Sequence, residues 1–300
     1  MTTPRSKTSG SNTGVTGDAA DSPTVRSALA AVFAEIRAAY GPQARRATEL
    51  PDGGHDPTFV DRTAPLLEFL WSRYFRVRLL GIENVPAQGP ALLVGNHSGG
   101  IPYDGALLLH GIHRDHPQHR RIRPLVANFA FRAGWMANVV ARIGGVPASR
   151  ENALPLLASG QLVAVFPEGL RGVGKLYRER YRMARFGRGG FVRLAAEARV
   201  PLIPVAVVGA EEIHPVIAKV TRIAEPLGLP YIPITPTFPW LGPLGLLPVP
   251  TKWTIQIGTP IAPPEVGDRA GLIHVAESVR GAIDTMIADL LVQRRSILFG

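Results

Sequence analysis

The sequence predicts an α/β fold, a single domain in which a mostly parallel or mixed sheet is flanked by helices. Two observations predict this class. Short, continuously apolar runs of strand length recur along the chain, and stretches with helical patterning lie between them. Strands that are apolar at every position indicate a sheet covered on both faces. The expected strands are residues 91–95, 124–127, 162–166, 201–208 and 253–258.

Helices are expected between and after these strands. The chain shows no internal repeat and no break in composition after residue 60, so residues 61–300 are predicted to form one domain. The helical stretches of this domain are expected near residues 104–110, 131–140, 151–159, 187–199 and 271–294.

The first sixty residues differ from this domain in composition. Residues 1–22 are rich in Ser, Thr and Gly and hold almost no large apolar side chain, which is typical of a disordered tail. Residues 23–40 begin with proline and are followed by Gly41, which predicts a helix. A polar linker follows at 41–60, so residues 23–60 are expected to form an N-terminal helix and linker.

Two further segments are apolar enough to touch a membrane. Residues 65–78 place apolar side chains on one helical face, which either packs on the core or lies at a lipid interface with its arginines beside the headgroups. Residues 229–250 are also strongly apolar, but their seven prolines exclude a regular helix or a central strand. The helical face consists of Leu66, Leu67, Leu70, Trp71, Tyr74 and Val77.

Composition and charge narrow the classes of function. The 300-residue chain has no cysteine, which excludes disulfides, thiolate nucleophiles and cysteine-bound zinc. Its net charge of +10 suits an anionic membrane, a phosphorylated small molecule or nucleic acid. No apolar run reaches the roughly 20 residues that span a bilayer, and the N-terminus holds no hydrophobic segment, so neither a transmembrane helix nor a signal peptide is expected.

A histidine and an aspartate follow the first predicted strand. Asn96 and His97 come directly after residues 91–95, where open α/β sheets place their ligand crevice, and Asp104 follows after a loop with two glycines. Histidine suits proton transfer near neutral pH. A carboxylate on one ring nitrogen would orient it, so that the other nitrogen can take a proton from a hydroxyl. The plainer interpretation is a capping aspartate beside a solvated histidine.

Charged side chains also follow other predicted strands. Arg150 ends the stretch GGVPASR just before a helix, and Glu168, Gly169 and Arg171 lie in the stretch FPEGLRG after the third strand. A Glu–Arg pair at this place is either structural or part of a site. A basic stretch, residues 171–193, begins here. Such stretches are usually solvated, but arginine also binds phosphate through paired hydrogen bonds.

These residues fall into four blocks, and their order and approximate spacing resemble those of a known family. The blocks are Asn96-His97 with Asp104, Gly145-Val146-Pro147 to Arg150, Phe166-Pro167-Glu168-Gly169-x-Arg171, and Val200-Pro201-Leu202-Ile203-Pro204-Val205. The family is the glycerolipid acyltransferase superfamily, of the lysophosphatidate and glycerol-3-phosphate acyltransferase type. The resemblance covers roughly residues 65–290.

The resemblance implies transfer of an acyl group from a thioester donor, acyl-CoA or acyl carrier protein, to a glycerol hydroxyl. His97 would be the general base and Asp104 would orient it, with no acyl-enzyme and no metal or cofactor. The acceptor would be bound by Arg150, Glu168, Gly169 and Arg171, the arginines holding its phosphate.

The implied acceptor is 1-acylglycerol-3-phosphate, in phospholipid or glycerolipid biosynthesis. Two departures from the family pattern bear on it. Six residues instead of four separate His97 from Asp104, and Leu170 stands where the family has threonine. Relatives with such motifs acylate neutral acceptors, and mono- or diacylglycerol is therefore the alternative. Candidate oxyanion donors are the backbone N–H groups near Gly99, Gly100 or Gly145.

Lipid substrates imply peripheral contact with an anionic membrane, on its cytoplasmic side. Nucleic acid is not expected as a partner, because the arginines gather in one stretch and no nucleic-acid-binding motif appears. A serine hydrolase using Ser98 would lack the usual G-x-S-x-G turn. A non-catalytic lipid-binding module of the same fold is the third alternative.

Overall fold

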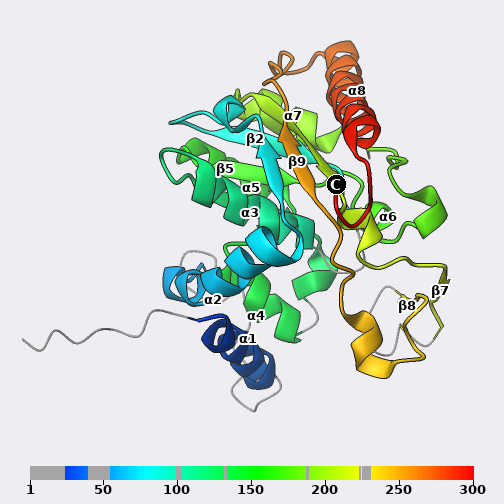
Figure 1. Ribbon diagram of the computed structural model, residues 1–300. Helices are drawn as coiled ribbons and strands as arrows, with labels where there is room; N and C mark the ends of the chain where they lie inside the picture. The colour runs from blue at the N-terminus through cyan, green and yellow to red at the C-terminus, as the bar shows by residue number, and fades with distance from the viewer. Residues whose placement is uncertain are drawn as a thin grey trace, which may run out of the picture.

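The computed structural model describes residues 24–39, 55–98, 103–131, 134–186, 189–222, 224 and 231–300. The tail predicted at 1–22 and most of the linker predicted at 41–60 lie outside the described residues. The α/β class is confirmed, because a seven-stranded sheet has helices on both of its faces (Figure 1).

The sheet is mixed and mostly parallel. Every neighbouring pair of strands is parallel except β6 and β9, which are antiparallel. The five apolar runs form five of the strands, and every residue of β2 and β6 is buried. In spatial order the strands are β1 (Arg78–Leu80), β9 (Thr254–Ile257), β6 (Leu202–Val208), β2 (Ala91–Gly95), β5 (Leu162–Val165), β3 (Ile122–Val126) and β4 (Val146–Pro147).

Alternate residues of each strand enter different cores, as the pleat requires. Leu92 and Val94 of β2 face one core, and Leu93 faces the other. The first core is closed by α5 (Arg150–Ala158), α7 (Gly190–Ala198) and α8 (Arg269–Gln293). The second is closed by α3 (Tyr103–Asp115) and by Trp71 and Phe75 after α2. A strand apolar at every position is thus explained by burial on both faces.

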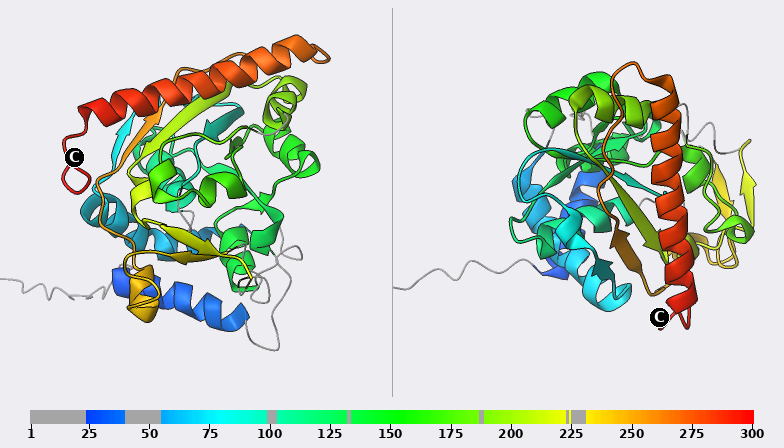
Figure 2. Two further views of the ribbon diagram at one scale, coloured as in Figure 1. Left: turned by 90° about the vertical axis from the view of Figure 1, so that its right-hand side faces the viewer. Right: turned by 90° about the horizontal axis from the view of Figure 1, so that it is seen from above.

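The N-terminal helices α1 and α2 lie on the side of the molecule opposite α8 (Figure 2). α1 (Val25–Ala39), close to the predicted 23–40, packs on α2 and on α4 (Gly134–Arg142). The helix predicted at 65–78 is misplaced. α2 spans Pro57–Phe69 and continues as a π-helical turn, η3 (Leu70–Tyr74), before β1 begins at Arg78.

The start of α2 has a clear physical cause. The carboxylate of Asp56 accepts the N–H of Phe59 at 3.1 Å, and Pro57 occupies the first helical position, where its missing N–H is not needed. Pro65, the first residue of the predicted helix, lies inside α2. Asp56-Pro57 is therefore the true starting signal.

The proline-rich segment belongs to a small module beside the main sheet, at the end where the parallel strand β6 finishes. β7 (Ala218–Val220) pairs with β8 (Ile232–Ile234) as a separate two-stranded sheet, and the turn η9 (Gly242–Leu246) follows. The chain leaves the end of β6 and returns at the start of the antiparallel β9, so the module lies where the parallel strands β2 and β5 also end. Five of its apolar side chains, the apolar tip, are exposed: Trp240, Leu241, Leu244, Leu246 and Leu247.

Short elements complete the chain. They contain three or four residues each and join the longer strands and helices. They are η4 (Ile82–Asn84), η5 (Asn128–Phe131), α6 (Leu170–Val173), η6 (Tyr177–Glu179) and η7 (Ala210–Glu212).

Candidate active site

The end of β2 is fixed to the neighbouring strand before the chain reaches His97. The side chain of Asn96 accepts the N–H of Val207 at 2.7 Å and donates to the carbonyl of Val207 at 3.0 Å. Asn96 is completely buried. This two-point contact with β6 sets the direction in which His97 leaves the sheet.

His97 and Asp104 are in direct contact. Nδ1 of His97 lies 2.8 Å from Oδ2 of Asp104, so the six intervening residues do not separate the pair. The same oxygen accepts the N–H of Ser98 at 2.9 Å and its hydroxyl at 3.1 Å, and Oδ1 accepts the N–H of Gly105 at 2.8 Å. Asp104 is fully buried and faces donors only. A carboxylate in this place accepts a hydrogen bond from a protonated Nδ1. The other ring nitrogen, Nε2, then carries no proton and can accept one.

The imidazole is held in place by packing as well. It stacks on the ring of Phe166 with centroids 4.7 Å apart and an interplanar angle of 26°. Phe166 follows β5, and Gly95 leaves room for its ring, since a Cβ at Gly95 would lie 3.0 Å from a ring carbon. The His97 side chain keeps 14% of its surface exposed, so the fixed ring still reaches solvent.

Glu168 lies behind His97. Its Oε1 accepts the N–H of His97 at 3.0 Å, and its Oε2 accepts the N–H of Ala184 at 2.6 Å. Its side chain has no exposed surface. The next residue, Gly169, has φ +53°, a left-handed conformation that glycine adopts without strain. Arg171 follows in α6 with its side chain exposed.

Arg150 lies apart from this group. It begins α5 after β4, the edge strand, which β5 and β3 separate from β2. Its guanidinium pairs with both carboxylate oxygens of Glu197, with Nε 2.6 Å from Oε2. The hydrogen bonds to Glu197 raise the pKa of Arg150 and lower that of Glu197. The structure thus brings His97, Asp104 and Glu168 together, while Arg150 is bonded elsewhere.

One of the expected oxyanion donors, the backbone N–H of Gly145, has another acceptor in the structure. The N–H of Gly145 donates to the carbonyl of Val140 at 2.8 Å at the end of α4, so it is already used. Gly99 and Gly100 lie outside the described residues.

A buried ion network beside Glu168 was not predicted from the sequence. Lys175, which belongs to the basic stretch 171–193, lies 2.9 Å from Oε2 of Glu168 and 3.1 Å from Oε1 of Glu211. Glu211 also accepts the N–H of Tyr181 at 2.8 Å. One signal was available, because the pair Glu211-Glu212 begins three residues after the end of a fully buried strand, β6, which lies next to β2 in the sheet.

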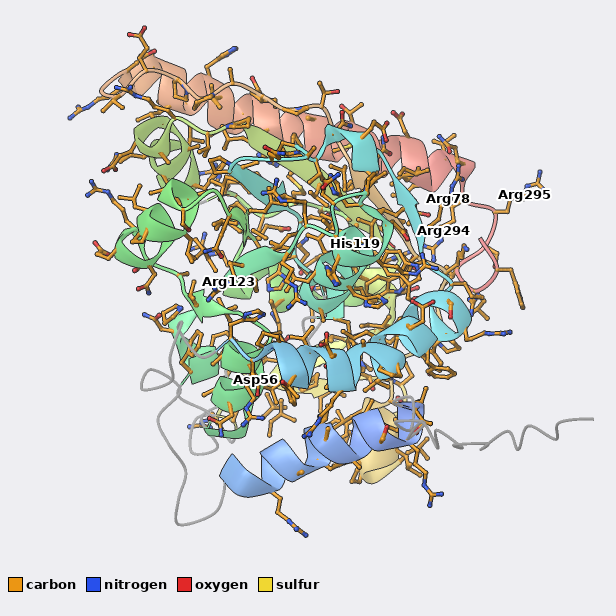
Figure 3. The ribbon with its side chains drawn as sticks, turned by 90° about the vertical axis from the view of Figure 1, so that its left-hand side faces the viewer. Asp56, Arg78, His119, Arg123, Arg294 and Arg295 are labelled. Carbon is orange, nitrogen blue, oxygen red and sulfur yellow. The ribbon has the colours of Figure 1, made fainter. Side chains whose placement is uncertain are left out.

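A second buried ion pair, between Arg294 and Glu212, lies next to this network. Arg294 lies 2.6 Å from Oε2 of Glu212. Figure 3 shows Arg294 turned toward the body of the protein at the end of α8, while the neighbouring Arg295 points away from it. Burial raises the pKa of the nearby Tyr181, whose hydroxyl accepts the N–H of Gly209 at 2.9 Å.

His214 is a buried imidazole that the motifs did not include. It packs near the ring of Tyr103, with centroids 6.3 Å apart, and its Nε2 has no hydrogen-bond partner. Burial lowers the pKa of His214 to about 4, so the ring is neutral at neutral pH.

Two features are absent from the described residues. No cluster of three His, Asp or Glu side chains there has the arrangement of a metal site. Among the same residues, no helix combines the length and apolar character needed to cross a bilayer.

The fold and the geometry together define a class of protein. An α/β sheet carries, where its parallel strands end, a histidine whose Nδ1 is held by a buried carboxylate and whose Nε2 is available. Such a pair removes a proton from a hydroxyl, as in enzymes that transfer groups to alcohols.

Comparison with known proteins identifies the family. The family model Acyltransferase matches residues 76–208. An uncharacterised protein of Mycobacterium tuberculosis is 43% identical over 253 residues, 82% of this chain and 71% of the relative. Residues 76–208 thus match the Acyltransferase family, in agreement with the resemblance of the four blocks to the glycerolipid acyltransferase superfamily.

More distant similarities concern shorter or weaker matches. The bovine (Bos taurus) "DGAT1/2-independent enzyme synthesizing storage lipids" is 31% identical over 126 residues, 41% of this chain and 36% of the relative. The crystal structure of PlsC, the 1-acyl-sn-glycerophosphate acyltransferase of Thermotoga maritima, aligns with a TM-score of 0.49 at 17% identity, over 88% of this chain and 98% of that chain.

Proposed function

We propose that the protein transfers a fatty acyl group from acyl-CoA or acyl carrier protein to the free hydroxyl of 1-acylglycerol-3-phosphate. The observation that carries this proposal is the contact between His97 and Asp104. Nε2 of His97 takes the hydroxyl proton while the oxygen attacks the thioester carbonyl. The C–S bond then breaks, and the imidazolium returns the proton to the departing thiolate.

Ser98 supports direct transfer over an acyl-enzyme. Its hydroxyl is buried and donates to Oδ2 of Asp104 at 3.1 Å. A serine nucleophile would instead donate to the base nitrogen of the histidine. Ser98 therefore helps to fix Asp104, and the acceptor hydroxyl is the group that His97 activates.

Arg171 supports a phosphate-bearing acceptor. Its side chain is exposed, and it lies three residues after Glu168, whose carboxylate accepts the N–H of His97. A guanidinium at this place suits one phosphate of a small acceptor through paired hydrogen bonds.

A neutral acceptor, mono- or diacylglycerol, is the second candidate. Arg150, the other arginine expected to hold phosphate, is bonded to Glu197. The partial similarity to the storage-lipid enzymes points the same way. Either acceptor uses the same base and the same donor.

A transfer assay with a panel of acceptors tests the proposal. Purified protein is incubated with labelled acyl-CoA or acyl carrier protein and with glycerol-3-phosphate, lysophosphatidate, lysophospholipids, monoacylglycerol or diacylglycerol. We expect the highest kcat/KM with lysophosphatidate. Transfer to neutral glycerides alone would select the second candidate, and no transfer to any member would contradict both.

We also propose that the protein binds the cytoplasmic face of a membrane peripherally, through the apolar tip. Trp240 and Leu244 are 76% and 70% exposed, and the tip lies at the sheet edge where His97 lies. Each large apolar side chain removed from water contributes about 1.5–3 kcal/mol, so a few of them anchor a protein reversibly. Lipid substrates would then enter beside the base.

Flotation with anionic vesicles tests this placement. We expect Trp240→Ser with Leu244→Ser to lower the fraction bound at least tenfold, because two apolar anchors are lost. Ile273→Ser is the matched control, since Ile273 is exposed on α8 outside the tip. Unchanged binding of the double variant would overturn the assignment.

A further inference from the structure

We propose that Lys175 and Glu211 are positioning residues for His97, acting through Glu168. The proposal deepens the acyl transfer described above and rests on it. It replaces the expected role of Glu168 as an acceptor-binding group with one inside the protein.

The first step is that Glu168 holds the main chain of His97. One carboxylate oxygen accepts the N–H of His97 at 3.0 Å, and the other accepts the N–H of Ala184 at 2.6 Å and lies 2.9 Å from Nζ of Lys175. Both oxygens are therefore occupied, and the side chain has no exposed surface. A carboxylate would also repel a substrate phosphate. Glu168 therefore affects the site by holding the main chain of His97, without contacting the substrate.

The second step is that Lys175 is the charged partner that holds the buried Glu168 in place. An ionised carboxylate removed from water needs a charged partner, and loss of that partner is strongly destabilising. Lys175 is 8% exposed in its side chain and contacts a second buried carboxylate, Glu211, which is 3% exposed. Burial alone lowers the pKa of Lys175, but the charges of Glu211 and Glu168 outweigh burial and raise it above its usual value. Lys175 is thus an ammonium ion at neutral pH.

The third step is that the network joins three neighbouring strand ends. His97 follows β2, Glu168 follows β5 and Glu211 follows β6, and β2 lies between the other two in the sheet. Glu211 is itself fixed by the N–H of Tyr181 at 2.8 Å. Lys175 therefore ties together the loops on both sides of His97.

The consequence concerns the direction of the imidazole. The ring must hold its hydrogen bond to Asp104 while Nε2 meets the acceptor hydroxyl. A displacement of about 1 Å in such a group lowers rates by as much as about 100-fold. Without Lys175, Glu168 is a buried carboxylate with no charged partner and moves, so the N–H of His97 loses a strong acceptor.

Two variants and a control test the proposal. Lys175→Met removes the ammonium, whereas Glu211→Gln keeps the Lys175–Glu168 pair and makes the network neutral, so it is expected to fold. Arg178→Met is the control, since Arg178 belongs to the same basic stretch but is 79% exposed. We expect at least a tenfold lower kcat for Lys175→Met and at least threefold for Glu211→Gln, each with KM within about threefold, and no change for Arg178→Met.

A spectroscopic measurement follows His97 without using activity. In protein with ¹⁵N-labelled histidine, the His97 ring signals are identified by their loss in His97→Gln. We expect them to shift in Lys175→Met and Glu211→Gln, and to stay unchanged in Arg178→Met.

The outcomes are distinct. If the wild type transfers no acyl group, the proposed function fails, and the ring signals still decide whether the network positions His97. If Lys175→Met does not fold, Glu211→Gln decides. Wild-type kcat together with unmoved His97 signals in a folded variant would overturn the positioning role.

Discussion

Nδ1 of His97 and Oδ2 of Asp104 lie 2.8 Å apart, although they belong to different elements and six residues separate them in the chain. His97 lies two residues after the end of β2, and Asp104 is the second residue of α3. Asp104 accepts three further hydrogen bonds from Ser98 and Gly105, so the carboxylate is fixed independently of the imidazole. The aspartate therefore orients the base and is not oriented by it.

Replacement of Asp104 by asparagine tests whether the carboxylate orients the imidazole of His97. The amide cannot accept every donor that now faces the carboxylate, and the imidazole loses its preferred tautomer. We expect kcat to fall by about 10²–10⁴ with the fold retained. Asp115→Asn at the end of the same helix is the control, because Asp115 bonds Arg114 only at the surface. Activity within threefold of wild type in Asp104→Asn would show that Nδ1 is oriented by another group.

Gly172 is a second point at which the site responds to a small change. A Cβ at this residue would lie 2.7 Å from Cβ of Glu168 and 3.0 Å from Cβ of His97. We expect Gly172→Ala to cost about 1–3 kcal/mol in the free energy of unfolding, measured in urea, and to lower kcat at least tenfold because His97 is displaced. Gly281→Ala, where a Cβ meets open space in α8, should gain up to about 1 kcal/mol at unchanged kcat. Full activity of Gly172→Ala would refute the close contact.

Arg171 separates the two candidate acceptors. If it binds the acceptor phosphate, Arg171→Gln removes a charge-assisted pair of hydrogen bonds contributing about 1.5–3 kcal/mol. We expect KM for lysophosphatidate to rise at least tenfold, and the kinetics with diacylglycerol to stay unchanged. Arg178→Gln should behave as wild type. Equal KM values for lysophosphatidate in Arg171→Gln and wild type would remove Arg171 from the site.

His214 gives stability a specific dependence on pH. Burial lowers its pKa to about 4 in the folded protein, below the ordinary 6.5 that applies to the unfolded chain. The unfolded state therefore binds a proton first as the pH falls, and the free energy of unfolding declines between about pH 6.5 and 4, by up to about 3 kcal/mol.

Removal of the imidazole isolates this effect. We expect urea unfolding of His214→Phe to lack that part of the decline, and the variant to be at least as stable as wild type at pH 7.5, since Nε2 has no partner to lose. Equal slopes in the two proteins between pH 6.5 and 4 would mean that His214 is already protonated or exposed in the folded state.

The parts of the fold that the sequence predicts are those with strong local patterns. β2 is found at the predicted 91–95, because a run buried on both faces is apolar at every position. β1 and β4 were not predicted, since strands of three and two residues are too short to show a pattern. The start of α2 was misplaced because the apolar face at 65–78 set the prediction, whereas the helix begins where the Asp56 side chain caps it and Pro57 takes the first helical position.

The site was predictable where residues follow a strand directly. His97 and Glu168 stand at strand ends, so one edge of the sheet brings them together. The ion pair of Lys175 with Glu211 was not predictable, because 36 residues separate its members and charge along the chain suggested a solvated stretch. The pairing of Arg150 with Glu197 likewise depends on how α5 packs on α7.

The most direct test of the central claim is the rate of acyl transfer by His97→Gln. Transfer from labelled acyl-CoA or acyl carrier protein is measured with the best acceptor of the panel, beside wild type and at matched folded concentration. We expect a loss of at least about 10²-fold in kcat, the scale of a missing general base. A folded His97→Gln protein that transfers acyl groups at the wild-type rate would contradict it.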